Sequence, residues 1–331
     1  MKKLFSSYET FVFLAIVILG AIITSVNPNF LTLENFLDLL KSYSFIGILS
    51  IGVLFVLISG GIDISFTATA TVSMYVMAVV VNQYGGNMFT AFLIASVVGI
   101  ILGMFNAVIV HSFKIHSIIA TIATLNIYYG LLTVFSGGKW IYSLPTWFRE
   151  FAQVRVFTLT KSTGGQYGLS IITVIWVALL ILAWLLLRYT IVGRGIYALG
   201  GNAVSAERVG FNILRLQLFV YGFMGWIAGI AGVVLTLLVQ SVAPNSIVGK
   251  ELDVLAAVIL GGASLMGGVG TLSGTILGVI LIATMNNGMT LMRIPAFWYD
   301  VFIGLIIVIS VSTSAIQHKK KKSKTIAIEV K

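Results

Sequence analysis

The sequence contains no cysteine, few prolines and few charged residues. Without cysteine it can form no disulfide, no thiolate metal site and no catalytic thiol. Charged residues make up 9% of the chain, against about 25% in soluble domains, which excludes an ordinary soluble fold. The histidines His111, His116 and His318 lack the spacing of metal ligands, and we therefore predict no metal site.

Sequence motifs of catalysis are absent as well. There is no phosphate-binding GxxxxGKS/T loop, no HExxH zinc motif and no nucleophile elbow. The run from Gly267 to Gly270 is too short, and too embedded in apolar sequence, to be a dinucleotide fingerprint. We therefore predict that the chain is not an enzyme, that it has no catalytic residue and no cofactor of its own, and that it cannot hydrolyse ATP.

Apolar residues make up 59% of the chain and occur in long runs. Because a helix needs about 20 apolar residues to cross the hydrocarbon core, we predict an all-α polytopic membrane protein with about ten transmembrane helices. The membrane domain would be residues 1–316 and a basic tail residues 317–331. The predicted spans are residues 11–26, 42–59, 64–81, 88–110, 117–135, 168–187, 214–239, 251–265, 272–289 and 297–311. The eighth is short enough to cross only part of the membrane.

Positive charge is distributed unevenly between the predicted loops. If both termini lie inside, the inner segments hold most of the Lys and Arg residues, including Lys2, Lys3, Arg194 and the run Lys319 to Lys322. Such residues gather on the cytoplasmic side, so we predict cytoplasmic termini. The same bias explains the net charge of +10 without a nucleic-acid partner. Residues 137–167 then form an external loop, whose aromatic residues fit an amphipathic stretch at the lipid interface.

Two glycine-rich interruptions break the apolar pattern. The first, residues 59–65, follows the second span, and the second, residues 260–270, follows the eighth. Paired interruptions in corresponding positions are typical of inverted repeats with a transport pathway nearby. We therefore predict two inverted five-helix halves.

Polar residues and glycines in these regions are candidates for the pathway or its gate. Asp63 is an intramembrane acid, which suggests function, although Asp63 and Ser65 could equally cap the next helix. The asparagines could line a path for a polar solute or bond one helix to another. The candidates are Gly60, Gly61, Asp63, Ser65, Asn106, Asn126, Gly261, Gly262, Asn286 and Asn287.

Residues 189–213 form a polar, glycine-rich segment between two apolar spans. Its charged residues could be an ordinary solvated face, but its density of glycine and small residues favours a surface that docks a soluble partner. The candidate docking residues are Arg194, Gly195, Gly200, Asn202, Glu207, Arg208 and Gly210.

Four ordered blocks resemble the ABC-importer permeases of the ribose type. The run from Ile58 to Ser65 is similar to their SGGIDLS motif, and the runs 193–202 and 206–210 to their cytoplasmic coupling segment. The run from Glu251 to Ser264 is similar to their ELDAIAAVVLGG block, and Asn286-Asn287-Gly288 to the NNGL that follows. One departure is Phe66-Thr67-Ala68, where the family usually has VGS.

The resemblance implies a permease of the vitamin-B12-transporter-like (type II importer) architecture in a bacterial cell membrane. It implies a second permease subunit, identical or not, a cytoplasmic ABC ATPase that carries ATP and Mg, and an external substrate-binding protein. The implied cargo is a monosaccharide or similar solute of the ribose, rhamnose or autoinducer-2 class. An ABC permease for nucleosides or branched-chain amino acids remains an alternative. A stand-alone secondary transporter is disfavoured because the spans hold few acids.

Overall fold

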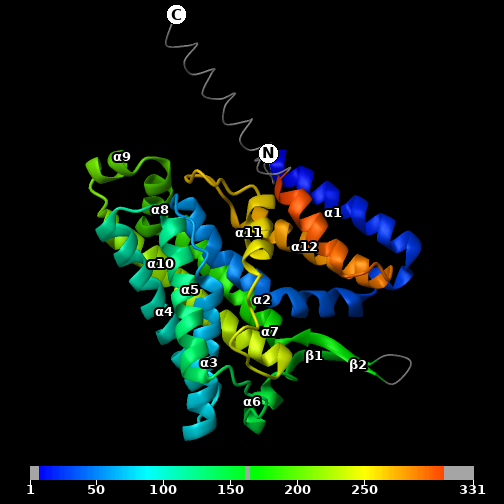
Figure 1. Cartoon of the computed structure of the whole chain (residues 1–331). Helices are drawn as coiled ribbons and strands as arrows, with labels where there is room; N and C mark the ends of the chain where they lie inside the picture. Colours follow the sequence, from blue (N-terminus) through cyan, green and yellow to red (C-terminus); the bar gives the residue numbers. More distant parts are fainter. Residues whose placement is uncertain (1–6, 161–164, 309–331) are drawn as a thin grey trace, which may run out of the picture.

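The computed structural model describes residues 7–160 and 165–308, and most of these residues are helical (Figure 1). The elements are α1 (Ser7–Val26), η1 (Pro28–Leu31), α2 (Leu33–Ile58), α3 (Phe66–Tyr84), α4 (Met88–Phe113), α5 (Ser117–Ser136), α6 (Thr146–Phe151), β1 (Arg155–Thr160), β2 (Gln166–Ser170), α7 (Ile171–Tyr189), α8 (Ile191–Gly201), α9 (Ala203–Arg208), α10 (Ile213–Val239), α11 (Glu251–Leu260) and α12 (Leu272–Leu291). A short apolar helix, Phe297–Val308, follows α12.

Eight helices of the described residues are long and apolar enough to cross a membrane: α1, α2, α3, α4, α5, α7, α10 and α12. The predicted eighth span contains a helix of only 10 residues, α11, because glycines end it at Leu260. The predicted tenth span is helical from Phe297 to Val308, and its residues 309–311 lie outside the described residues, as does the tail 317–331. The structure thus shows a mostly helical polytopic membrane protein with eight candidate spans.

The all-α prediction is wrong in the predicted external loop. Strands β1 and β2 form an antiparallel hairpin, in which Thr158 lies opposite Gly168. A Cβ at Gly168 would stand 1.9 Å from the Phe157 carbonyl oxygen, so only glycine fits there. The sixth span therefore begins at Ile171 and not at residue 168. Phe148 of α6, which was expected at the lipid interface, is fully buried instead.

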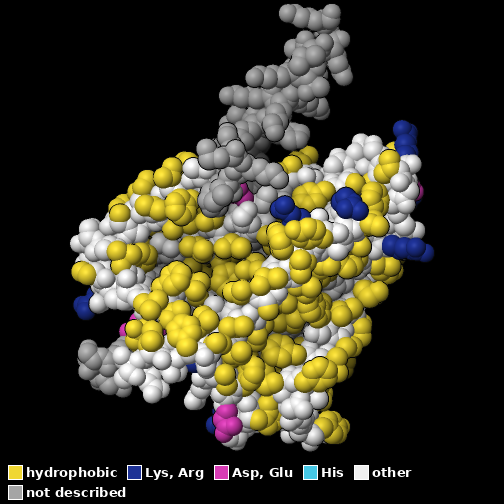
Figure 2. Space-filling model, turned by 180° about the vertical axis from the view of Figure 1, so that it is seen from behind, with side chains coloured by type: hydrophobic (Ala, Val, Ile, Leu, Met, Phe, Trp, Pro, Cys, Tyr) yellow, Lys and Arg dark blue, Asp and Glu magenta, His cyan; other side chains and the backbone are white. Residues whose placement is uncertain are grey.

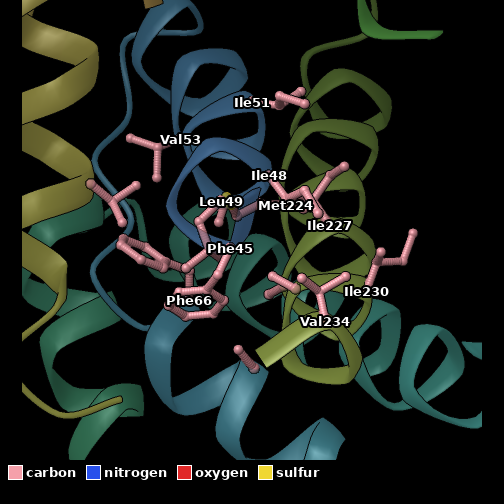
Figure 3. Packing of buried hydrophobic residues seen from close by; sticks show 14 of the residues in the cluster. Phe45, Ile48, Leu49, Ile51, Val53, Phe66, Met224, Ile227, Ile230 and Val234 are labelled. Atoms are coloured by element: carbon pink, nitrogen blue, oxygen red, sulfur yellow. The ribbon is translucent and has the colours of Figure 1, made fainter. Parts of the chain in front are cut away.

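Helix α2 forms the centre of the packing, with α7, α10, α11 and α12 around it. Almost every residue of α2 from Ser44 to Ile58 is buried, because neighbours cover all of its faces. Its side chains interleave with those of α10, where Ile48 and Leu49 lie close to Met224 and Ile227 (Figure 3). The N-terminus of α2 is capped by Thr32, whose hydroxyl accepts a bond from Asn35 N at 3.2 Å.

Helices α4 and α10 pack backbone against backbone. A Cβ at Gly99 of α4 would stand 2.0 Å from the Gly225 carbonyl oxygen of α10, and one at Gly229 would stand 2.2 Å from the Ala95 oxygen. Small residues four apart allow such close approach in membrane helices. These two helices therefore form one rigid pair.

The outer surface and the two ends of the molecule differ in polarity. Figure 2 shows apolar side chains across the middle of one face, with Lys and Arg toward its margins. The start of α1 and the α8–α9 segment lie toward one end of the molecule, and α6 with the hairpin at the other (Figure 1). An apolar belt between two polar ends is the surface that a bilayer requires.

Candidate functional site

The first interruption ends α2 in a Schellman motif. Gly60 has φ of 84°, its N–H donates to Leu57 O at 3.0 Å, and Gly61 N–H donates to Val56 O at 3.1 Å. A left-handed residue after the last turn satisfies the free carbonyls of the helix, and glycine adopts it without strain. The chain can then leave α2 and turn back toward α3.

Asp63 lies inside this turn and is 2% exposed. Its Oδ1 accepts two bonds from Ser65, one from the backbone N–H at 2.8 Å and one from the hydroxyl at 2.7 Å. The Ser65 hydroxyl in turn accepts a bond from Asn106 Nδ2 at 2.7 Å. Ser65 itself makes no side-chain cap at the start of α3. Asp63 therefore holds the start of α3 in place and connects it to α4.

Helix α5 supplies partners for the backbone of the same interruption. Ile62 N–H donates to Ser117 Oγ at 2.9 Å, and Ile64 N–H donates to Thr121 Oγ1 at 3.2 Å. The Tyr128 hydroxyl donates to Leu102 O at 3.0 Å and lies 3.3 Å from Asn106 Oδ1. Hydroxyl groups of one span thus satisfy irregular backbone in another, as a non-helical segment inside a membrane domain requires.

The second interruption ends α11 with the same motif. Gly262 has φ of 89°, its N–H donates to Ile259 O at 2.9 Å, and Ala263 N–H donates to Val258 O at 3.2 Å. Gly261 packs on Gly274 of α12, since a Cβ at Gly261 would stand 2.5 Å from the Gly274 oxygen. The loop that follows closes on itself through Ser264 N–H and Val269 O at 2.9 Å.

The coupling segment forms two helices, α8 and α9. Thr190 caps α8 by accepting from Gly193 N–H at 3.0 Å, and Asn202 caps α9 by accepting from Ser205 N–H at 2.9 Å. Gly195 is buried against Phe211 and Leu216, and Gly210 turns the chain with φ of 95°. The charged residues among the predicted docking residues are all exposed: Arg194, Glu207 and Arg208.

Glycines from α8 and from both interruptions meet at one point, which we call the glycine junction (Gly60, Gly200, Gly267 and Gly268). Gly268 N–H donates to Ile58 O at 2.8 Å. A Cβ at Gly200 would stand 1.8 Å from the same Ile58 oxygen, and one at Gly267 would stand 2.6 Å from Gly60 Cα. Figure 1 shows the loop after α11 reaching across to α8. The junction places α8 in backbone contact with both interruptions.

Tyr197 adds a side-chain bond beside the junction. Its hydroxyl donates to Gly270 O at 2.8 Å. Burial raises the pKa of the Tyr197 phenol above its ordinary value, so the proton needed for this bond is retained. A second fixed point therefore joins α8 to the loop after α11.

The predicted asparagines lie in different surroundings. Asn287 of α12 forms a reciprocal pair with Asn35 of α2, with bonds of 2.9 and 3.0 Å. Asn126 is exposed on α5 and its amide donates to Ile122 O at 2.8 Å, while Asn286 is half-buried. The structure thus brings Asp63, Ser65 and Asn106 together but leaves the other asparagines apart from them.

Several residues of this region were not singled out from the sequence. Ser117, Thr121 and Tyr128 stand in an apolar span without a distinguishing motif, and only the fold brings them to the first interruption. Thr67 donates to Glu251 across to α11, and Thr271 and Ser273 donate to Glu9, with the Thr271 bond at 2.7 Å. The sequence signal that could have identified the α5 hydroxyls is their helical spacing, at positions 117, 121 and 124.

These features define a class of protein: a polytopic helical membrane protein whose α8–α9 segment contacts two breaks between its spans. The chain belongs to the family of permease components of branched-chain amino acid transport systems, which it matches over residues 35–311. It is 33% identical to the ribose import permease protein RbsC of Haemophilus influenzae, over 90% of each chain. It is 34% identical to RbsC of Bacillus subtilis, again over 90% of each. It is 30% identical to the autoinducer 2 import system permease protein LsrC of an Enterobacter species, over 93% of this chain and 86% of the relative. No solved structure matches the chain.

Membership of this family confirms the predicted class. The chain is a multi-pass permease component of an ABC importer, a transport subunit and not an enzyme. Its partners are an ATPase, which binds the nucleotide, and a substrate-binding protein.

Proposed function

We propose that this permease imports a monosaccharide or sugar-like solute of the ribose, rhamnose or autoinducer-2 class. The support is its similarity over most of its length to ribose and autoinducer 2 permeases at 30–34% identity. The family description names branched-chain amino acids, and these or nucleosides are the second candidate. Uptake into proteoliposomes, with the ATPase and the binding protein present, separates the two when pentoses, deoxyhexoses and leucine are compared. Transport of leucine alone would overturn the sugar assignment.

ATP-driven motion enters the membrane domain through α8 and α9, at the predicted docking residues. The glycine junction is the observation that supports this role, because α8 touches both interruptions without intervening side chains. In the resembling permeases such a segment seats in a groove of the ATPase. Exposed Arg194, Glu207 and Arg208 supply the polar contacts, while buried Gly195 and half-buried Gly200 hold α8 against the spans.

A charge reversal tests this role. Arg208 is exposed at the end of α9, so Arg208→Glu leaves the fold intact and removes a contact with the ATPase. We expect stimulation of ATPase activity by the permease to fall at least about tenfold, which corresponds to 1.4 kcal/mol. Lys139→Glu, at the opposite end of the molecule, is the matched control and should leave stimulation unchanged. Unchanged stimulation in Arg208→Glu, or uptake by this chain without the ATPase, would contradict the proposal.

The working unit pairs two permease subunits across exposed membrane helices, with both termini and α8–α9 in the cytoplasm. Asn126 and Gly130 lie on the exposed face of α5, and no side chain covers Gly130 within the described residues. An amide on a lipid face is costly and small residues favour helix contact. The matching motifs that end α2 and α11 support two inverted five-helix halves in the type II importer manner. Cysteine cross-linking at position 130 in this cysteine-free chain tests the pair.

The pathway and gate would lie near the two interruptions. The residues proposed for it remain Gly60, Gly61, Asp63, Ser65, Asn106, Asn126, Gly261, Gly262, Asn286 and Asn287. The burial of Asp63 and Asn106 supports a positioning role for these two residues. The exposure of Asn126 supports direct contact between its side chain and the solute. The membrane unit is 1–316, with the basic tail 317–331 following it.

A further inference from the structure

A polar cavity of about 280 Å³ opens beside the glycine junction. It is lined by Gly60 and Gly61 of the first interruption, the turn between α4 and α5, Leu199 of α8, and Gln217 and Tyr221 of α10. The cavity lies within one chain and is separate from the exposed face of α5. Gly60 and Gly61 are also pathway candidates, but the transport role proposed above assigns nothing to the polar side chains that line the cavity.

The described groups that line this cavity include hydrogen-bond donors and two basic side chains, Lys114 and His116, and no Asp or Glu. Helix α5, which is 20 residues long, begins at Ser117 immediately after these two residues. Its first residue is preceded by His116, which makes no side-chain cap. The positive end of the helix dipole and its free N–H groups therefore face the same region as the two basic residues.

Gln217 is arranged to donate as well. Its Oε1 lies 2.8 Å from His111 Nδ1. Because an amide oxygen can only accept, Nδ1 must carry the proton, and the amide nitrogen of Gln217 is left to donate elsewhere. This pair adds a further neutral donor to the cavity wall.

Tyr221 provides an independent sign that a ligand is missing. It lines the cavity and is 2% exposed, yet its hydroxyl has no hydrogen-bond partner in residues 7–160 and 165–308. A Cβ at Gly61 would stand 2.7 Å from the Tyr221 oxygen, so glycine is required beside it. A buried donor without a partner destabilises the folded state, and an acceptor in the cavity would recover that loss.

We propose that this cavity binds a phosphate group, carried either by an anionic lipid headgroup or by a free small molecule. Lys114 supplies charge, His116 supplies a ring N–H, the start of α5 supplies backbone donors, and Tyr221 and Gln217 supply neutral donors. An oxyanion with several acceptor oxygens satisfies these donors and balances the charge of Lys114, whereas a cation does neither and a neutral sugar leaves that charge unpaired. A bound phosphate bridges the α4–α5 turn to α10 next to α8, and so stabilises the folded state.

Thermal unfolding of the purified full-length chain, followed by tryptophan fluorescence, tests the site. Inorganic phosphate is titrated in neutral detergent against chloride at equal ionic strength. Ligand that binds only the folded state raises the midpoint, and saturation should add about 3 °C. Tyr221→Phe and Lys114→Gln should each remove the shift, whereas Lys139→Gln at the opposite end should keep it. Because Tyr221→Phe deletes only an unpaired hydroxyl, its midpoint without phosphate should not fall.

Nanodiscs distinguish the two sources of phosphate. If a headgroup binds, wild-type protein melts higher in phosphatidylglycerol than in phosphatidylcholine, and Tyr221→Phe erases the difference. If only a free phosphate binds, the two lipids give equal midpoints and added inorganic phosphate raises both. Equal midpoints together with no phosphate effect would overturn the proposal. A shift that survives in both Tyr221→Phe and Lys114→Gln would overturn it as well.

Discussion

The two interruptions end their helices in the same way but continue differently. Gly60 and Gly262 both take positive φ and both close a Schellman motif. After Gly60 the chain is half-buried or buried, and Asp63, Ser65, Ser117 and Thr121 satisfy its polar groups. After Gly262 the chain is exposed at its tip, where Met266 is 73% exposed. The first interruption is therefore an internal anchor, and the second extends a loop to the surface of α8.

The glycine junction is where these two segments meet, and Gly200→Ala should break it. The added Cβ would overlap the Ile58 oxygen, so the backbones must separate, at a cost of about 3 kcal/mol typical of severe overpacking. We expect the unfolding midpoint to fall by several degrees and uptake to fall more than tenfold. Gly201→Ala is the matched control, since no atom lies within 4 Å of its Cβ position. Equal unfolding midpoints and equal uptake in the two variants would show that the glycine junction contributes neither to stability nor to transport.

Removal of Asp63 should affect only the first interruption. Asp63→Ala leaves the N–H and hydroxyl of Ser65 without their acceptor inside a buried site, at a cost of about 2 kcal/mol. A lower unfolding midpoint in detergent is the measurement. The exposed Asp38→Ala in α2 should change the midpoint little. If Asp63→Ala matches that control, the anchor assignment is wrong.

Gly60→Ala and Gly262→Ala compare the two motifs directly. Each forces an L-residue into the left-handed region, at a cost of about 1–2 kcal/mol, and so each should lower the unfolding midpoint slightly. Only Gly60 faces α8, with Gly200 Cα 3.4 Å from its Cβ position, whereas Gly262 faces Tyr8. We therefore expect ATPase stimulation to fall in Gly60→Ala and to persist in Gly262→Ala. If ATPase stimulation instead persisted in Gly60→Ala and fell in Gly262→Ala, the second helix end and not the first would be the one that transmits motion from α8.

The smallest effect belongs to the exposed tip of the second interruption. Met266→Ser should change the free energy of unfolding by less than about 0.5 kcal/mol, as is usual for surface positions. Ser117→Ala, which deprives Ile62 N–H of its acceptor in the first interruption, should cost about 1 kcal/mol. Chemical denaturation of both variants measures the difference. A larger loss from Met266→Ser would place that side chain in a contact outside the described residues.

The sequence predicted the long spans well because a run of about 20 apolar residues has few alternatives to a membrane helix. It also located both interruptions, since paired glycines with a polar neighbour end such helices. It missed the hairpin of β1 and β2, whose two strands are short and whose register depends on Gly168. It could not predict the glycine junction, because the three segments are far apart in the chain and no side chain marks the contact. The hydroxyls of α5 were missed because only the fold brings them to the first interruption, from more than 50 residues away in the chain.

A contact made only of backbone has a consequence for redesign. The glycine junction has no side chain that could be exchanged to adjust its strength, so substitutions there abolish the contact instead of tuning it. The exposed face of α8–α9 carries Arg194, Glu207 and Arg208, whose chemistry can be varied freely. In our proposal, recognition of the ATPase and transmission of its motion therefore depend on opposite sides of one short helical segment. A permease of this design could be adapted to a different ATPase by substitutions on the exposed face of α8–α9, while the glycine junction is left unchanged.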